Sequence, residues 1–228
     1  MTQHTVAAFD TELKDLRTSV QTMAATVDTQ LTRLAEAIEG RQSETAQHII
    51  AMDRSVDRLQ TEIEEKIVQM IARRQPVAVD LREVIATLKI TSDLERIGDL
   101  AKNCGKRLVA MSAQGQQPET MSTLLSLARQ AQSQVVDVME AFAHRDAAAA
   151  LQVWRSDSTI DNLYTALFRE LLTYMMEDPR NIGFCAHLLF CAKNLERIGD
   201  HATNIAENVN FIVTGDQIGI DRPKGESP

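Results

Sequence analysis

The sequence contains few aromatic, cysteine and proline residues, and these shortages exclude several classes of protein. Aromatic residues make up 4% of its 228 residues, and it has five prolines and three cysteines. An odd number of cysteines without a CxxC pair argues against a disulfide framework and against a thiolate zinc site. The most apolar stretch, residues 182–195, contains His187 and Lys193. It is also shorter than the roughly 20 residues that span a bilayer.

Acidic residues outnumber basic ones, 32 to 24. The formal net charge is −8 and the isoelectric point is about 5.2. No Lys/Arg-rich run and no basic strand studded with aromatics is present, so we expect no nucleic-acid partner. Residues 1–15 lack the basic segment and apolar core of a secretory signal. We therefore expect a cytoplasmic protein.

Strong helix formers fill the stretches between the prolines. Ala, Leu, Glu, Gln, Arg and Met dominate there, and apolar residues recur every three or four positions. This pattern predicts an all-α protein. The expected helices cover about residues 5–39, 43 to a break at 73–76, 77–111, 118–143, 146–176 and 181–213.

One ten-residue motif occurs twice, as LERIGDLAKN at residues 94–103 and LERIGDHATN at residues 195–204. Such long-range self-similarity indicates an internal duplication, and the expected helices repeat in the same order in both halves. We expect two tandem antiparallel three-helix bundles, arranged end to end and joined near residues 115–118. They would cover residues 1–114 and 115–213, followed by a mobile tail at 214–228. The periodicity is equally compatible with one continuous six-helix bundle.

Acidic residues four apart recur in both halves, in the repeated motif and in the helix before it. On a helix this spacing places two carboxylates side by side, where like charges destabilise by a few tenths of a kcal/mol. The pairs are Asp53 with Asp57, Glu95 with Asp99, Asp157 with Asp161, and Glu196 with Asp200.

The numbering places both acidic pairs of each half at one height. In an antiparallel hairpin, residues equally far along the chain from the turn lie level. Asp57 and Glu95 are equally far from Pro76, as are Asp53 and Asp99. The second half behaves alike about a turn between residues 178 and 179. We therefore expect four carboxylates to meet in each hairpin.

Three interpretations of these carboxylates stay open. They lie on the polar side of the third helix of each half, which is typical of a solvated face. Asp99 is also placed to pair with Lys102, although the counterpart of Lys102 is Thr203. Third, carboxylate clusters without thiolates or imidazoles suit Mg²⁺, Ca²⁺, Mn²⁺ or iron. Asn103 and Asn204 would then support the ligands.

Other residues of the repeated motif have structural interpretations. Arg96 and Arg197 point away from the acids, which favours ion pairs between helices. Gly98 and Gly199 lie inside helices, where glycine costs about 1 kcal/mol, so we expect a close approach to a neighbouring helix. His201 replaces Leu100 of the first copy, which favours a packing role.

These residues resemble the PhoU family, the phosphate-specific transport system accessory proteins of bacteria. The resemblance rests on the paired LERIGD motifs with their downstream asparagines, on Asp-x-x-x-Asp in the preceding helix, and on RRQPVAVDLR at residues 73–82. It covers about residues 5–213. It implies two three-helix bundles related by an internal repeat, with metal clusters bound on the bundle surface.

The resemblance also implies the ligands. The ions would be divalent or trivalent, with Mg, Mn, Fe and Zn as candidates. The second half has NIGFCAH in place of PVAVDLR, so a duplicated role for Asp80 and Arg82 is not expected. The implied ligands are Asp53, Asp57, Glu95, Asp99, Asp157, Asp161, Glu196 and Asp200.

By the same resemblance the protein would be a non-enzymatic regulator in the cytoplasm. It would link the ATPase of a phosphate ABC transporter to a sensor histidine kinase, and would reduce phosphate uptake and the phosphate-starvation response when phosphate is plentiful. A homodimer is implied, and contact with the membrane would be only indirect, through these partners. The residues show no convincing catalytic nucleophile.

Two enzyme classes and one structural class are alternatives. A ferritin-like di-iron oxidase needs Glu-x-x-His on two helices, and the sequence has no such motif. An all-helical, metal-dependent nucleotide pyrophosphohydrolase also uses acidic pairs on neighbouring helices, with Mg²⁺ bridging the substrate phosphates. A helical adaptor that binds no metal is the third alternative.

Overall fold

The computed structural model describes residues 2–40, 43–112 and 121–218, and the side chains of 9–40, 44–112 and 121–218. Within these ranges the regular secondary structure is helical, which confirms the all-α class. The helices are α1 (Thr2–Gly40), α2 (Ser43–Arg74), α3 (Ala78–Ser112), α4 (Met121–His144), α5 (Ala147–Arg155), α6 (Asp157–Glu177), the short 3₁₀ helix η1 (Pro179–Asn181) and α7 (Ile182–Thr214).

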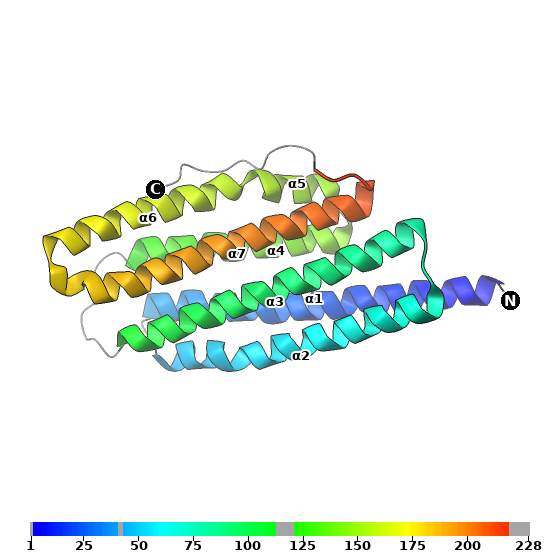
Figure 1. Cartoon of the computed structure of the whole chain (residues 1–228), viewed down its shortest axis with the longest axis horizontal. Coiled ribbons are helices and arrows are strands. Elements are labelled where there is room, and N and C mark those ends of the chain that lie inside the picture. The colour runs from blue at the N-terminus through cyan, green and yellow to red at the C-terminus, as the bar shows by residue number, and fades with distance from the viewer. Residues whose placement is uncertain (1, 41–42, 113–120, 219–228) are drawn as a thin grey trace.

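The helices form two antiparallel bundles that lie side by side along their length (Figure 1). Helices α1, α2 and α3 make the first bundle, and α4, α5, α6 and α7 make the second. Helix α3 packs along α7, and α1 packs along α4. Two bundles related by an internal repeat are therefore confirmed, but their predicted end-to-end arrangement is wrong. The reason is that α3 and α7 carry apolar residues on the sides that face each other as well as on the sides that face their own bundles.

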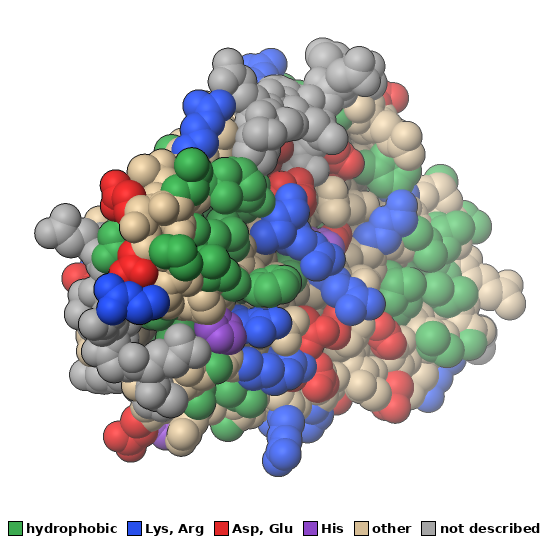
Figure 2. Space-filling model, turned by 60° about the vertical axis from the view of Figure 1, so that its left-hand side comes forward, with side chains coloured by type: hydrophobic (Ala, Val, Ile, Leu, Met, Phe, Trp, Pro, Cys, Tyr) green, Lys and Arg blue, Asp and Glu red, His purple; other side chains and the backbone are tan. Residues whose placement is uncertain are grey.

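The outer faces carry the polar residues expected of amphipathic helices. Figure 2 shows acidic and basic side chains mixed across the middle of one face, with hydrophobic side chains on both sides of them. Among the exposed apolar residues, Val77 and Met176 lie at the ends of the two hairpins, with 73% and 85% of their surface exposed. In the described ranges, no helix combines the length and the apolar character needed to cross a membrane.

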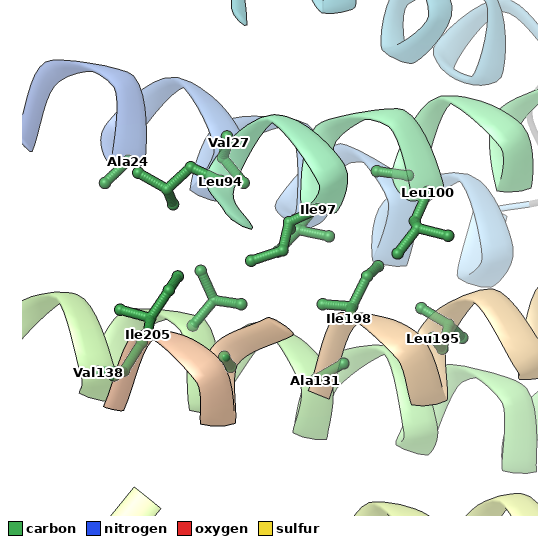
Figure 3. Close-up of a cluster of buried hydrophobic side chains, with 14 of the residues drawn as sticks. Ala24, Val27, Leu94, Ile97, Leu100, Ala131, Val138, Leu195, Ile198 and Ile205 are labelled. Carbon is green, nitrogen blue, oxygen red and sulfur yellow. The ribbon is translucent and has the colours of Figure 1, made fainter. Parts of the chain in front are cut away.

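One hydrophobic core runs through both bundles. Figure 3 shows Leu94, Ile97 and Leu100 of α3 facing Leu195, Ile198 and Ile205 of α7, with side chains of α1 and α4 behind them. All six are buried. Since burial of apolar surface stabilises by about 25 cal/mol per Å², this shared seam holds the two repeats against each other.

Both predicted hairpin turns are confirmed. The α2–α3 turn passes through Pro76, with Gln75 and Ala78 in the left-handed region at φ 48°. The α6–α7 turn begins at Asp178, whose Oδ1 accepts from the backbone N–H of Arg180 at 2.9 Å. Helix α7 ends at Gly215 with φ 87°, and Gly215 N–H donates to the carbonyl of Phe211. The predicted junction at 115–118 and most of the predicted tail lie outside the described residues.

The single helix predicted over residues 146–176 is wrong, because α5 and α6 are separate. Ser156 lies between them with ψ −1°, and its N–H donates to both Gln152 O and Val153 O. Its side chain donates to Val153 O at 2.8 Å and accepts from Gln134 at 3.1 Å. Helix α5 ends at Arg155 and α6 begins at Asp157, so Ser156 alone lies between the two helices.

The predicted close approach at Gly98 and Gly199 is confirmed. A Cβ on Gly98 would lie 3.3 Å from Val56 Cγ1 of α2, and one on Gly199 would lie 2.7 Å from Ile160 Cδ1 of α6. These glycines let α2 and α6 approach α3 and α7, which carry the acidic residues.

Candidate functional site

Helices α2 and α3 bring together the four acids of the first half, here named the first acidic cluster: Asp53, Asp57, Glu95 and Asp99. The Lys102 ammonium joins the two helices, because its Nζ lies 2.5 Å from Asp53 Oδ2 and 2.5 Å from Asp99 Oδ1. The negative charges of Asp53 and Asp99 also act on Asp57 and Glu95. The level placement predicted from the distance to Pro76 is therefore seen in the structure.

The first acidic cluster is more buried than a solvated face. Asp53 is 5% exposed, Glu95 and Asp99 are half-buried, and only Asp57 is exposed. Burial raises the pKa of Glu95, and the neighbouring Asp99 charge raises it further. Burial also raises the pKa of Asp57, and the negative charge of Asp53 adds to this effect. The cluster thus holds negative charges that repel each other in a partly desolvated place.

Lys102 offsets part of this repulsion. Partial burial opposes its charge, but the hydrogen bonds to Asp53 and Asp99 raise the pKa of Lys102 well above its usual value. The predicted pairing of Lys102 with Asp99 is confirmed, and the contact with Asp53 on the other helix is a second one that the motif alone did not reveal.

Helices α6 and α7 bring together the second acidic cluster: Asp157, Asp161, Glu196 and Asp200. Asp157 is 3% exposed, and the Thr203 hydroxyl lies 3.1 Å from its Oδ1. Burial raises the pKa of Glu196, and the charges of Asp200 and Asp161 add to this effect.

The cation of the second acidic cluster comes from a different position. Lys193, one turn before Glu196, places its Nζ 2.7 Å from Glu196 Oε2 and 5.3 Å from the centre of the Tyr164 ring. This pair lies within α7, because both Lys193 and Glu196 belong to that helix.

The expected pairing of Arg96 between helices is wrong, and two further residues of the motif contact α3. Arg96 pairs within its own helix, at 3.6 Å from Glu95 and 3.7 Å from Asp99, and not between helices. Asn204 donates to Asp93 of α3 at 3.4 Å and so supports the seam between the repeats. His201 also contacts Asp93, with its Nδ1 2.9 Å from Asp93 Oδ1. His201 therefore has a polar contact in addition to its packing.

The donor set of both clusters consists of carboxylate oxygens, which hard cations prefer. In the present arrangement, no three Asp, Glu, His or Cys side chains of the described residues converge closely enough to hold a metal ion. In the first acidic cluster the Lys102 ammonium lies between two carboxylates, at a point where positive charge is stabilised. A metal ion there would compete with Lys102, whereas at the matching point of the second acidic cluster it would meet Thr203.

Two features of the clusters were missed from sequence. The Lys102 contact with Asp53 was detectable, because the two residues lie nearly level about the turn at Pro76. The pairing of Lys193 with Glu196 was also detectable, because Lys193 precedes Glu196 by three residues, a spacing that allows an ion pair on a helix.

A family model described as "PhoU domain" matches the chain twice, at residues 20–108 and 124–209. The two matches correspond to the two repeats of the fold, and each contains one acidic cluster.

The chain is also similar to proteins named phosphate-specific transport system accessory protein PhoU homolog. That of Rhizobium meliloti is 44% identical over 223 residues, covering 98% of this chain and 94% of the relative. That of Caulobacter vibrioides (strain NA1000 / CB15N) is 46% identical over 224 residues, covering 98% and 97%.

Two solved structures have the same fold. The crystal structure of PhoU from Pseudomonas aeruginosa aligns with a TM-score of 0.89 at 38% identity, over 91% of this chain and 100% of the other. The phosphate transport system regulatory protein PhoU from Streptococcus pneumoniae aligns with a TM-score of 0.85 at 28% identity, over 93% and 100%.

Proposed function

Because the chain belongs to the PhoU family, we propose that it is a regulatory accessory protein of phosphate uptake whose two acidic clusters bind metal ions. It acts in the cytoplasm by contact, linking the ATPase of a phosphate ABC transporter to a sensor histidine kinase and reducing uptake when phosphate is plentiful. The observation that carries the metal part is the presence of two carboxylate clusters at matching positions of two repeats.

The charge balance of the clusters supports metal binding. In each one, burial and neighbouring carboxylates raise the pKa of a glutamate, Glu95 in the first and Glu196 in the second. A divalent or trivalent ion supplies the positive charge that removes this repulsion. Asp53 and Asp157, the most buried acids, would anchor the ion, and the more exposed acids would complete the ligand set by rotating toward it.

A bound ion would connect α2 to α3 in the first repeat and α6 to α7 in the second. Each connection includes one helix of the seam, α3 or α7, so occupancy would affect how firmly the hairpins pack on it. Regulation through such contacts requires no chemical step. The protein's own groups would hold the metal, orient the hairpins and present their surface to the partners.

Elemental analysis of protein purified without chelator or affinity metal tests the metal sites. The comparison variant carries Asp53→Asn, Asp57→Asn, Glu95→Gln and Asp99→Asn, and a matched variant carries the corresponding changes at Asp157, Asp161, Glu196 and Asp200. We expect metal in the native protein and loss of about half of it in each variant. The absence of metal from native protein supplied with Mg²⁺, Mn²⁺, iron and Zn²⁺ would contradict the proposal.

A pull-down with the transporter ATPase and with the kinase tests the adaptor role. Folded protein should be retained by at least one of them, and sedimentation should show a homodimer. Failure with both partners would overturn the adaptor role and leave metal binding untouched. A hydrolysis assay with nucleoside triphosphates separates the enzyme alternative, since metal-dependent turnover that the two cluster variants lose would identify a pyrophosphohydrolase.

A further inference from the structure

Two of the three cysteines meet inside the seam between the repeats. Cys104 lies on α3 and Cys191 on α7, and each is 1% exposed. The sulfur of Cys104 lies 3.7 Å from the carbonyl oxygen of Cys191, and the sulfur of Cys191 lies 3.9 Å from the carbonyl oxygen of Cys104. These reciprocal contacts show that the two side chains cross between the helices.

Both thiols lie in this buried crossing of the two helices. The neighbouring Cys104 thiol and burial raise the pKa of Cys191 well above its usual value. All three cysteines are free thiols. The third, Cys185, is buried near the start of α7, and burial raises its pKa with no second thiol contributing.

The internal repeat shows that packing alone does not require cysteines here. Helices α3 and α7 are equivalent and antiparallel, so exchanging the repeats places Cys104 and Cys191 on Ile205 and Ile90. Both isoleucines are fully buried. The seam therefore has Ile90 and Ile205 at one position and the two cysteines at the equivalent position.

We propose that Cys104 and Cys191 form a disulfide under oxidation by a hydroperoxide, and that this bond locks the two repeats together. One thiolate attacks the peroxide, giving a sulfenic acid and one water. The sulfur of the second cysteine then displaces the hydroxyl group, forming the S–S bond and a second water. Two thiols and one hydrogen peroxide thus give one disulfide and two waters. This inference does not rest on the proposed function.

The bond would cross-link residues far apart in the sequence, since 87 positions separate them. A cross-link that closes so long a loop restricts the unfolded chain strongly. It would also prevent α3 and α7 from separating. Burial of both thiols means that the oxidant reaches them only when the seam opens transiently, so the reaction reports on that opening.

Peptide mapping of protein treated with hydrogen peroxide tests the proposal. Trypsin cleaves after Lys102, Lys106, Arg180 and Lys193, which places Cys104 in residues 103–106 and both other cysteines in residues 181–193. The expected product is a cross-link of these two peptides that dithiothreitol removes. Fragmentation of the longer peptide between Cys185 and Cys191 assigns the bond in the native protein, so no variant has to fold.

Variants sharpen the assignment. Cys185→Ser should keep the cross-link, and Cys191→Ser should abolish it. In a chain with all three cysteines replaced by serine, Ile90→Cys with Ile205→Cys recreates the pair at the equivalent position and should cross-link as well. Oxidised native protein should melt higher than reduced protein by on the order of 10 °C.

Three results would overturn the proposal. The first is the recovery of Cys104 and Cys191 as free thiols after denaturation and alkylation of peroxide-treated protein. The second is a bond that involves Cys185 or joins two molecules. The third is a lower melting temperature of the cross-linked protein, which would mean that the bond distorts the seam and does not lock it.

Discussion

The two acidic clusters have the same carboxylates on equivalent helices, but their charges are neutralised differently. In the first, Lys102 joins Asp53 to Asp99 across two helices. In the second, the equivalent position is Thr203, which offers a hydroxyl to Asp157, and Lys193 pairs with Glu196 instead. Both repeats therefore have the carboxylates at equivalent positions, but the lysine that pairs with them occupies a different position in each. The first acidic cluster contains a cation that joins its two helices, whereas Lys193 of the second pairs with an acid on its own helix.

The largest expected effect comes from making the first acidic cluster resemble the second. Lys102→Thr removes the ammonium that contacts a buried carboxylate, and leaves at most one hydroxyl bond in its place. We expect the free energy of unfolding to fall by about 2 kcal/mol, measured by urea denaturation in the presence of chelator.

The same variant should bind metal at the first acidic cluster about tenfold more tightly, since the competing cation is gone. Calorimetric titration with Mn²⁺ measures this affinity. The matched control is Lys106→Thr, an exposed lysine on the same helix, which should change neither quantity. Unchanged stability and unchanged affinity in Lys102→Thr would remove the distinction between the clusters.

A smaller effect is expected from the neutral partner of the second acidic cluster. Thr203→Val keeps the volume of a fully buried side chain and removes the hydroxyl that lies 3.1 Å from Asp157 Oδ1 and 3.0 Å from the carbonyl oxygen of Gly199. We expect a loss of about 1 kcal/mol in unfolding free energy, since the buried oxygens of Asp157 and Gly199 lose this hydroxyl as a donor.

Thr203→Ser is the control for this loss, because it keeps the hydroxyl and removes only a methyl group. Thermal denaturation of the two variants in chelator compares them. If valine is tolerated better than serine, the hydroxyl contributes less than the methyl packing, and the second acidic cluster does not depend on Thr203.

The features that could be predicted depend on regular geometry. Helical rise and the positions of Pro76 and Pro179 were enough to place Asp53 level with Asp99, because both are properties of the backbone. The side-by-side arrangement was not predictable, since the residues of α3 that face α7 could have been buried against any apolar surface. The burial of Asp53 and Asp157 also escaped prediction, because it depends on how closely the neighbouring helices pack at Gly98 and Gly199.

The pH dependence of the unfolding free energy should give a still smaller difference between the clusters. Burial and Asp99 raise the pKa of Glu95 in the folded protein above its usual value of 4.5, so the folded state binds a proton more tightly than the unfolded state. Ionised Glu95 therefore destabilises the fold above its raised pKa, and this cost disappears as the pH falls through that pKa toward 4.5. Glu95→Gln should stabilise the protein by about 0.5 kcal/mol at pH 7 and by nothing below about pH 4.

Glu196→Gln is the comparison for this pH profile. The pKa of Glu196 is also raised. Its ion pair with Lys193 is 2.7 Å long, shorter than the 3.6 Å contact of Glu95 with Arg96, so the gain of Glu196→Gln at pH 7 should be smaller. Unfolding free energies from pH 4 to pH 8 in chelator measure both profiles. A stabilisation by Glu95→Gln that grows as the pH falls would have the wrong sign and would exclude the buried-repulsion explanation.

The smallest effect is expected at Arg96, the other cation of the first acidic cluster. Its side chain is 59% exposed, and its contacts with Glu95 and Asp99 are 3.6 and 3.7 Å long. Exposed pairs of this kind contribute between about 0 and 1 kcal/mol, and alanine is the better helix former, so Arg96→Ala should change the unfolding free energy by less than about 0.5 kcal/mol. Arg197→Ala, the exposed counterpart in the second repeat, should behave alike in the same urea titration. A loss at Arg96 as large as that of Lys102→Thr would mean that the guanidinium neutralises the first acidic cluster too, and the contrast between the clusters would then rest on two cations and not on Lys102 alone.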